Sequence, residues 1–586
     1  MARRAGSRLE ADEPPGPGSD WNEMNMNSGT GGAGRNLKLS PLALLALAVA
    51  VCVGVGLGAI GYRAWANRGD DAPAKPAPKV QAAVTEVAPG KPGLTRPAGD
   101  PNQENAKPGS AYPAQFSTES MFPRFHPDRR YYVSRCVPGK VEVQVKAKEG
   151  ATVQVAGYPA ETGRFMAEAR ALPGQAFTVT AAVDGKSTEY QVRCLPSDFP
   201  QWGYQRFADP PKGMYLISYR PQVPDFQDAW LIVFDQDGAP RWWLSPETNA
   251  LGGQILADGT VQFPRGFGDG FGQDERTANE IRTLDGRLIR TVRFRGAPTD
   301  GHEYYRLPNG NAYIMSYKPR LGVDLTSVGG EKDEGVLDGA IQEVTPSGKV
   351  VWSWNSKDHV ELSDIPDRWW KRILVNPHVD PDGNSRYDIF HLNSIEPWGD
   401  QLVLSTRHTD RVWGISKKTG EVQWTFGGND GPKSLRIEGE DPLKEYPLGG
   451  NHDARMNGDV LSIHDNGTHL DRPPRMLRYR IDLKDRTATF VGQDLDVKAA
   501  PTSHCCGGVR KLGTGWVVAW GNSPFITGFN ADDEIAFRLA VSTPVYRAVP
   551  VPDSVTAEDL SRALDRMAPD IPPPDRPVRP IKYYDR

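Results

Sequence analysis

The stretch between residues 388 and 455 decides the fold of this 586-residue chain. It contains the strings DIFHLNSI (388–395), STRHTDRVW (405–413) and GGNHDAR (449–455). Each string leads into or lies on an apolar run that ends in a turn signal, as in HLNSIEPWGDQLVLSTR. This pattern is typical of a strand, a Gly turn and a second strand. Polar residues therefore head the strands, and we expect the fold to bring these strand heads together.

The same unit recurs from about residue 201 to residue 540. It consists of an apolar strand, a Gly turn, a second strand and a strand pair with Asp-Gly or Ser-Gly, as in HEYYRLPNGNAYIMSY with AIQEVTPSGKVVWSW. About six such units predict an all-β, six-bladed β-propeller, because radially packed blades bury faces that one four-stranded sheet leaves exposed. A sandwich or a solenoid fits the unit length less well. We assign residues 197–545 to this propeller, as the catalytic domain, and the Pro-rich, charged residues 546–586 to a C-terminal tail or a strap that closes the ring.

Composition excludes two classes of function. A sequence pI near 6.3 and a formal net charge of −4 lack the basic footprint of a general nucleic-acid binder. The phosphate-cradling pattern G-x-x-x-x-G-K-[ST] is absent, so no nucleotide site of that type is expected. We therefore expect no nucleic-acid partner and no cofactor, while the oligomeric state stays open.

The N-terminal region predicts a membrane anchor. Residues 1–37 are rich in Gly, Asn and charged residues, which is typical of a disordered tail, here placed in the cytoplasm. Leu39–Tyr62 is an uncharged run that spans the ~30 Å hydrocarbon core if it is helical, so residues 38–63 are predicted to be an N-terminal transmembrane helix. A cleaved signal peptide is the alternative, because AWA at 64–66 resembles a cleavage site. We favour a single-pass protein of the cell membrane whose C-terminal domains are extracytoplasmic.

A spacer and a small domain precede the propeller. Residues 64–130 are rich in Pro, Ala, Gly and Lys, which predicts an extended linker. Residues 131–196 alternate at period two, for example in KVEVQVKA and TEYQVRC, and this predicts a small β-sandwich domain. Cys136 opens the domain and Cys194 closes it. A disulfide between them would contribute about 4 kcal/mol, and two buried free thiols are the alternative.

Histidines recur at the heads of the predicted innermost strands. His302, His391 and His452 each stand at such a position, and His504 lies close to it in the last unit. The first strand of each propeller blade lines the central channel, so we expect these side chains to converge on one mouth. A lone histidine at a strand head is more often structural, but recurrence at blade-like separations favours a shared site.

The neighbours of these histidines indicate the ligand. Three histidines can hold Zn²⁺ and leave one position open. Arg407 and Asn393 fall beside the set, however, and a guanidinium repels a cation but suits a sulfate, phosphate or carboxylate. We therefore expect an anion site and no metal. His408 follows Arg407 directly and should point to the opposite face of its strand.

The strings DIFHLNSI, LSTRHTDRVW, EVQWTFGG and NHDAR resemble the arylsulfotransferase-like family of extracytoplasmic six-bladed propellers, over roughly the propeller. The sequence looks closer to its shorter, divergent branch. The resemblance implies transfer of a sulfuryl group from a small aromatic sulfate donor to a phenolic acceptor, without a nucleotide donor, through a sulfated histidine. Carried over by position, His452 would be the nucleophile. The sulfuryl oxygens would be bound by His302, His391, Asn393 and Arg407, with His504 near the same set.

The residue types suit this chemistry. A neutral imidazole can attack sulfur and carry the group between two in-line steps. Charge on the sulfuryl oxygens needs fixed donors, which Arg, His and Asn supply, and another His would transfer the phenolic proton.

Other interpretations stay open at this point. The same basic mouth would suit a non-catalytic propeller that binds an anionic cell-envelope ligand, and the histidines would suit a metal-dependent hydrolase. The adjacent Cys505 and Cys506 form either a vicinal disulfide or two free thiols. Trp369, Trp370 and Trp398 are able to wall an aryl pocket, although blade packing is the more common use of such residues.

Overall fold

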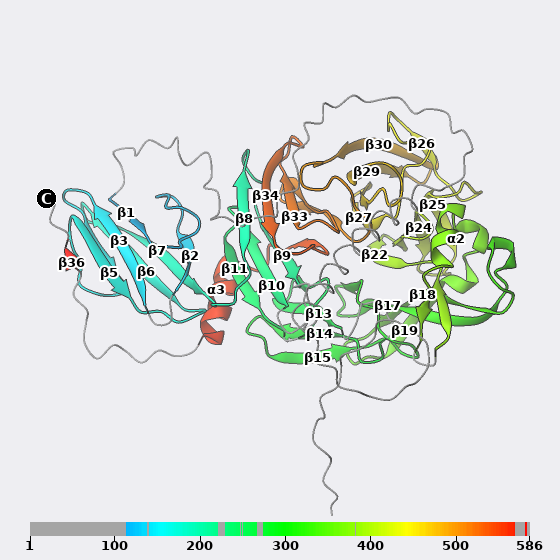
Figure 1. Ribbon diagram of the computed structural model, residues 1–586, viewed down its shortest axis with the longest axis horizontal. Coiled ribbons are helices and arrows are strands. Elements are labelled where there is room, and N and C mark those ends of the chain that lie inside the picture. Colours follow the sequence, from blue (N-terminus) through cyan, green and yellow to red (C-terminus); the bar gives the residue numbers. More distant parts are fainter. Residues whose placement is uncertain are drawn as a thin grey trace, which may run out of the picture. The chain divides into compact units, whose positions relative to one another are not determined.

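Strands dominate the part of the chain that the structure describes. This computed structural model describes residues 113–136, 140–220, 229–246, 248, 250–266, 274–380, 383–568 and 581–582. Within these residues the only α-helices are α2 Asp367–Ile373 and α3 Ala557–Met567. The all-β class is therefore confirmed (Figure 1).

The predicted location at the membrane is corrected. A helix rises about 1.5 Å per residue and needs about 20 apolar residues to cross a bilayer. The longest described helix, α3, has 11 residues, and no helix in the described ranges is long and apolar enough to cross a membrane. Residues 38–63, the predicted anchor, lie outside the described residues, as do the predicted tail 1–37 and most of the predicted linker.

Two four-stranded sheets form the first β unit of the described chain. One has the order β1 Ala114–Ser117, β3 Val141–Ala147, β5 Arg164–Ala169 and β36 Ile581–Lys582. The other has the order β2 Tyr131–Arg135, β7 Lys186–Leu195, β6 Ala176–Val183 and β4 Thr152–Val155. In β3, buried and exposed residues alternate strictly, because successive side chains of a strand point to opposite faces. The strand β1 lies in the stretch whose composition indicated linker.

The predicted disulfide is confirmed. Cys136 directly follows β2, Cys194 lies in β7, and the parallel pairing of these two strands brings the two Cα atoms to 5.5 Å. Both cysteines belong to the buried core that the two sheets share.

Six further sheets follow one another along the chain. The first comprises β9 Met214–Tyr219, β10 Trp230–Asp235, β11 Pro240–Leu244 and β35 Ala548–Pro550. The second comprises β12 Gln254–Ile255, β13 Thr260–Arg265, β14 Ala278–Thr283 and β15 Leu288–Val292. The third comprises β16 Tyr304–Arg306, β17 Ala312–Val323, β18 Glu334–Val344 and β19 Val350–Asn355, extended by β20 His378–Val379 and β21 Ser385–Asp388.

The last three sheets repeat the same meander. The fourth comprises β22 Leu392–Trp398, β23 Gln401–Thr406, β24 Arg411–Ser416 and β25 Val422–Gly427. The fifth comprises β27 His452–Asn457, β28 Val460–Asp465, β29 Arg475–Asp482 and β30 Thr487–Asp494, with β26 Arg436–Glu438 at its edge. The sixth comprises β31 Gly508–Leu512, β32 Gly515–Ala519, β33 Phe525–Phe529, β34 Ile535–Val541 and β8 Trp202–Arg206.

Both ends of this region close the ring. The early strand β8 pairs with β34 of the sixth sheet, and the late strand β35 pairs with β9 of the first. These pairings cover the outer edge of the last sheet and the inner edge of the first, where an open sheet would leave unpaired backbone groups. Six sheets closed in this way form a β-propeller, and we call them blades 1 to 6 (Figure 1). The segment that contains β35 belonged to the predicted tail.

In blades 4 and 6, a glycine in the third strand makes room for an aromatic ring of the fourth strand. A Cβ atom at Gly414 in β24 would lie 2.1 Å from the ring of Trp424, its partner in β25. A Cβ at Gly528 in β33 would lie 1.9 Å from the ring of Phe537 in β34. The missing side chain lets the aromatic ring of the outer strand lie directly across the sheet.

A long insertion lies between blades 3 and 4. It contains the 3₁₀ turns η4 Ser356–Asp358 and η5 Leu362–Asp364, helix α2, β20 and β21. Helix α2 buries Trp369, Trp370 and Ile373, which lie on one face at helical spacing. It has Asp367 in its first turn and basic residues in its last, an arrangement that the helix dipole favours.

Candidate functional site

Three imidazoles meet where the innermost strands of blades 3, 4 and 5 begin. The centroid of the His302 ring lies 5.3 Å from that of His391 and 6.1 Å from that of His452. His302 precedes β16 by two residues, His391 precedes β22 by one, and His452 is the first residue of β27. Equivalent positions of three blades therefore supply the three rings.

Aspartates orient two of these rings. Nδ1 of His302 lies 2.8 Å from Oδ1 of Asp300, which also accepts the backbone N–H of His302 at 2.8 Å. Nδ1 of His391 likewise contacts a carboxylate oxygen of Asp388, whose other oxygen accepts the His391 backbone N–H at 3.0 Å. A ring nitrogen that faces a carboxylate carries the proton, so in both rings Nε2 is left with its lone pair.

His452 is held differently. Its Nδ1 donates to the carbonyl oxygen of Gly507 at 2.7 Å, and its Nε2 makes no hydrogen bond. The edge of the Tyr546 ring packs against it at 5.2 Å between centroids. His452 is only 1% exposed, so an unpartnered lone pair lies in a buried, largely aromatic setting.

Burial keeps the imidazoles of His391 and His452 neutral near pH 7. Desolvation lowers the pKa of His391 well below its usual value, and the positive charge of Arg407 lowers it further. Desolvation also lowers the pKa of His452 well below its usual value, with Arg547 and His302 acting in the same direction. A neutral imidazole keeps the lone pair that nucleophilic attack requires.

Arg407 adjoins this cluster through fixed contacts. Its Nη2 donates to the carbonyl oxygen of His504 at 2.9 Å, its Nη1 lies 2.7 Å from Nε2 of His408, and its guanidinium lies 4.7 Å from the ring centre of Trp369. Nδ1 of His408 in turn donates to the carbonyl oxygen of Asp388 at 2.6 Å. His408 therefore faces the site and positions the guanidinium, whereas the strand alternation had predicted the opposite face.

Two other predicted binding residues have different partners. The side chain of Asn393 donates to the carbonyl oxygen of Asn451 at 3.0 Å and accepts the backbone N–H of Asp453 at 3.1 Å. It thus links blade 4 to blade 5 beside His452. The ring of His504 is exposed and stacks on His469 at 5.7 Å, so this residue meets Arg407 through its backbone.

A buried network of ion pairs around Asp453 holds the backbone next to the histidines. Asp453 accepts from Arg510 at 2.7 Å through both oxygens and lies 3.2 Å from Nε of Arg547. Arg547 also donates to the carbonyl oxygens of His302, at 2.9 Å, and of Asn393. Arg455 donates to Asp453 at 2.8 Å, so the aspartate and the arginine of the NHDAR string belong to the charged network that fixes the backbone next to His302 and His452.

A cavity of about 360 Å³ opens beside this cluster. Its wall includes the predicted residues His391 and Arg407, together with Asp388, His408 and Trp369. His302 and His452 do not line it, and they are 5% and 1% exposed. The fold therefore brings four of the predicted side chains close together. His391 and Arg407 line the cavity, whereas His302 and His452 are buried beside it.

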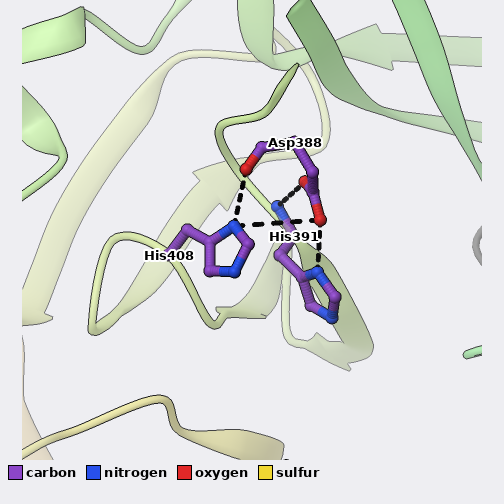
Figure 2. Close-up of side chains that lie close together, drawn as sticks. All are labelled: Asp388, His391 and His408. Carbon is purple, nitrogen blue, oxygen red and sulfur yellow. Dashed lines mark hydrogen bonds and ion pairs between the residues drawn. The ribbon is translucent and has the colours of Figure 1, made fainter. Parts of the chain in front are cut away.

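Figure 2 shows one carboxylate oxygen of Asp388 joined by dashed lines to the rings of both His391 and His408. Among the described residues, these three form a group whose potential metal-ligand atoms lie within 4.8 Å of one another. Both nitrogens of His408 already have hydrogen-bond partners, however, and one of these partners is the guanidinium of Arg407. A fixed positive charge at that distance opposes a divalent cation, so the group fits an anion site better than a resident metal.

Two adjacent free thiols lie near Arg407. Cys505 and Cys506 are not joined to each other. A hydrogen bond with Cys506 lowers the pKa of Cys505 to about 7 despite burial, and Arg407 contributes, whereas the pKa of Cys506 is raised well above its usual value. The residues on either side of the pair, His504 and Gly507, provide the carbonyl oxygens that bind Arg407 and His452.

Sequence reasoning missed the partners of the histidines. Asp300 and Asp388 stand two and three residues before His302 and His391, and an Asp shortly before a strand-head His was visible in DGHEYY and DIFHLNSI. The carbonyl oxygen of Gly507 gives no sequence signal, because any residue supplies one.

The fold and the site define a β-propeller that gathers buried neutral imidazoles and a guanidinium beside a cavity. Residues 250–542, half of the chain, match the family described as Arylsulfotransferase (ASST). The chain belongs to this family, which gives it a sulfotransferase-type function.

Similar solved structures share little sequence with the chain. A periplasmic gluconolactonase from Pseudomonas aeruginosa is 13% identical, with 58% of this chain and 98% of that chain covered and a TM-score of 0.31. The β-propeller domain of Cps50 from Myceliophteria thermophila is also 13% identical, with 58% and 88% covered and a TM-score of 0.31. No curated protein sequence matches the chain.

Proposed function

We propose that the chain transfers a sulfuryl group from an aryl sulfate to a phenol through Nε2 of His452. The observation that carries the proposal is the state of this ring. Its Nδ1 is held by a carbonyl oxygen, its Nε2 has no hydrogen-bond partner, and burial keeps it neutral. A ring in this state presents an oriented lone pair and has no competing bond to break before it attacks.

The transfer proceeds in two balanced steps. In the first, the Nε2 lone pair of His452 forms a bond to sulfur while the bond from sulfur to the aryl oxygen breaks, and the phenolate leaves with that electron pair. In the second, the oxygen of the acceptor phenol attacks sulfur, the N–S bond breaks, and the phenolic proton passes to a neighbouring base. The carboxylate partners of His302 and His391 suit these two rings to accept and return protons.

Positive charge at the cavity supports the reaction. Arg407 places a guanidinium there, held by the carbonyl oxygen of His504 and by His408, and fixed donors of this kind stabilise the charge on the sulfuryl oxygens. Because His452 does not line the cavity, the donor reaches it only after the side chains that cover it move. The polar atoms of Asn393 hold the start of β27, which positions His452 rather than the substrate.

The test follows the sulfuryl group to one histidine. The full chain is incubated with 4-nitrophenyl sulfate, digested with trypsin and analysed by mass spectrometry. Trypsin separates the three candidates, because His302 falls in peptide 296–306, His391 in 387–407 and His452 in 445–455. We expect one added sulfuryl group on 445–455 and its loss when phenol is supplied.

The controls separate the alternatives. His452→Asn should abolish both the labelled peptide and the release of 4-nitrophenolate, whereas His359→Gln, which changes a ring stacked on Trp354 in blade 3, should change neither. Label on 387–407 would move the nucleophile to His391. Activity that EDTA removes and zinc restores would replace the transferase with a metal-dependent hydrolase at Asp388, His391 and His408.

A further inference from the structure

The insertion between blades 3 and 4 supplies one wall of the cavity. From helix α2 and the turn after it come the lining residues Trp369, Arg372, Ile373, Asn376, Pro377 and His378. The propeller contributes His391, Arg407 and His408 to the lining, and Asp388 at the end of the insertion lies beside them. A wall that is separate from the reacting residues is the part of a site that distinguishes one substrate from another.

Trp369 has an unused donor. Its side chain is 1% exposed, and guanidinium groups lie 4.5 Å and 4.7 Å from its ring centre, those of Arg368 and Arg407. The indole Nε1–H is buried and makes no hydrogen bond. A buried donor without an acceptor is unfavourable, so an acceptor oxygen on a bound molecule would satisfy it.

Arg372 has an unused positive charge. It lies in the last turn of α2, is exposed, and has no hydrogen bond or ion pair from its guanidinium to any described residue. Arg368, one helical turn earlier, differs, because its guanidinium already pairs with Asp410 and donates to the carbonyl oxygen of Thr468. Among the basic residues of this helix, Arg372 is therefore the one that lines the cavity with a guanidinium that no described residue binds.

The charge of the cavity favours an anion with two negative groups. Two arginines line it, Arg372 and Arg407, against one carboxylate, that of Asp388, which His391 already contacts. Burial lowers the pKa of His469, which lines the same cavity, to about 4, and the positive charges of Arg372 and Arg407 add to this effect. One guanidinium suits the sulfuryl group, and the second is left for an anionic group on the aromatic ring that gives or receives the sulfuryl group.

We propose that the aromatic substrate carries a second anionic group, a carboxylate or a sulfonate on the ring, which Arg372 binds. This proposal rests on the proposed function for the identity of the first group. The ring packs against the apolar wall of Leu337, Ile373 and Pro377, and an oxygen of the substrate accepts from Nε1 of Trp369. A cavity of about 360 Å³ is at the lower end of the range for small-molecule sites, which fits one substituted aromatic ring.

Matched acceptors test the second group. With 4-nitrophenyl sulfate as donor, kcat/KM is measured for phenol, 4-hydroxybenzoate and 4-hydroxybenzenesulfonate. We expect the two anionic acceptors to exceed phenol by roughly tenfold, the effect of one partly exposed charged hydrogen bond. Arg372→Gln should remove this preference, so that kcat/KM for the two anionic acceptors falls to within about twofold of the value that the same variant shows with phenol.

Lys371→Gln is the matched control. It removes the same charge one residue away on α2, from a side chain that does not line the cavity, so the preference should survive. Trp369→Phe keeps an aromatic ring but removes the Nε1–H donor, and it should lower kcat/KM with all three acceptors. A preference that persists in Arg372→Gln, or its absence in the unmodified chain, would overturn the proposal.

Calorimetry keeps the two proposals apart. Binding of 4-hydroxybenzoate and of phenol to the full chain needs no turnover. If no transfer occurs but 4-hydroxybenzoate binds more tightly in an Arg372-dependent way, the second-anion site stands and the transferase fails. If transfer occurs without any preference, the transferase stands and the second-anion site fails. If neither transfer nor preferential binding occurs, both fail.

Discussion

Replacing Asp388 with asparagine tests whether the carboxylate that orients His391 matters for turnover. Asp388 contacts His391 twice, through the backbone N–H and through Nδ1, and its carbonyl oxygen accepts from His408. Asparagine has nearly the same size and keeps an oxygen for the backbone N–H. Its amide can also donate to Nδ1, however, which would move the ring proton of His391 to Nε2. The variant therefore changes the tautomer of His391 with little change in packing.

The hydrogen bonds of Asp388 set the expected loss of kcat/KM. A hydrogen bond to a charged group contributes about 1.5–3 kcal/mol, so its loss lowers kcat/KM by roughly 10- to 150-fold if it is made in the transition state. Burial raises the pKa of Asp388, although the charges of His408 and Arg407 oppose this. The carboxylate is thus protonated at a higher pH than usual as the solution becomes acidic. Activity of the unmodified chain should fall with this protonation, and the Asp388→Asn variant should lack that acidic limb.

The assay is release of 4-nitrophenolate from 4-nitrophenyl sulfate with phenol as acceptor, measured across pH. Asp380→Asn is the control. It removes a carboxylate of the same insertion, one that pairs with Arg386 at 2.7 Å and not with a histidine. We expect that control to stay within about twofold. If Asp388→Asn also keeps more than half of kcat/KM and the same pH profile, orientation of His391 by Asp388 has no part in catalysis.

Three further predictions concern stability and reactivity. Burial lowers the pKa of His464 to about 4, whereas a histidine of the unfolded chain has a pKa near 6.5, so at pH 5 the unfolded chain binds a proton that the folded chain does not. The free energy of unfolding should therefore fall by roughly 2 kcal/mol between pH 7 and pH 5. Urea titrations at the two pH values should show a smaller fall for His464→Gln. Replacing Cys136 and Cys194 together by alanine opens a link across 58 residues and should lower the free energy of unfolding of that domain by about 4 kcal/mol, whereas a loss below about 1 kcal/mol would refute the loop-entropy argument. Iodoacetamide at neutral pH should alkylate Cys505 well before Cys506, as peptide mapping would reveal, because the Cys505 thiol has a pKa lowered to about 7 and that of Cys506 is raised; equal rates would contradict these directions.

Much of the propeller was predictable because its signal is repetitive and local. Gly turns and apolar strands mark each blade, and the strand-head rule found His302, His391 and His452. The rule included His504 because it did not count how many residues separate the histidine from the start of its strand. His504 stands four residues before β31, whereas the other three stand within two residues of their strands, so its ring points elsewhere and only its backbone reaches Arg407.

The cavity wall from the insertion was not predictable in the same way. Residues 356–388 do not repeat, and the Trp369–Trp370 pair was compatible with packing or with a pocket. The structure shows both uses in neighbouring residues, since both rings are buried but Trp369 also lines the cavity. Helix periodicity predicts that both tryptophans lie on the inward face of α2. It does not predict which of them lines the cavity, because that face contacts both the core and the cavity.

The acceptors on the three rings support a division of roles among the histidines. A carboxylate stabilises the imidazolium that forms when a ring takes up a proton, and His302 and His391 each have one. A carbonyl oxygen orients a ring without offering a full negative charge, and His452 has only this partner at Nδ1. A ring that must carry a sulfuryl group on Nε2 needs orientation at Nδ1 but gains nothing from becoming a stronger base. The proton-transfer rings and the nucleophile would thus be distinguished by what binds Nδ1, which is why exchanging the Asp388 carboxylate for an amide should impair the transfer of a proton and leave attack by His452 possible.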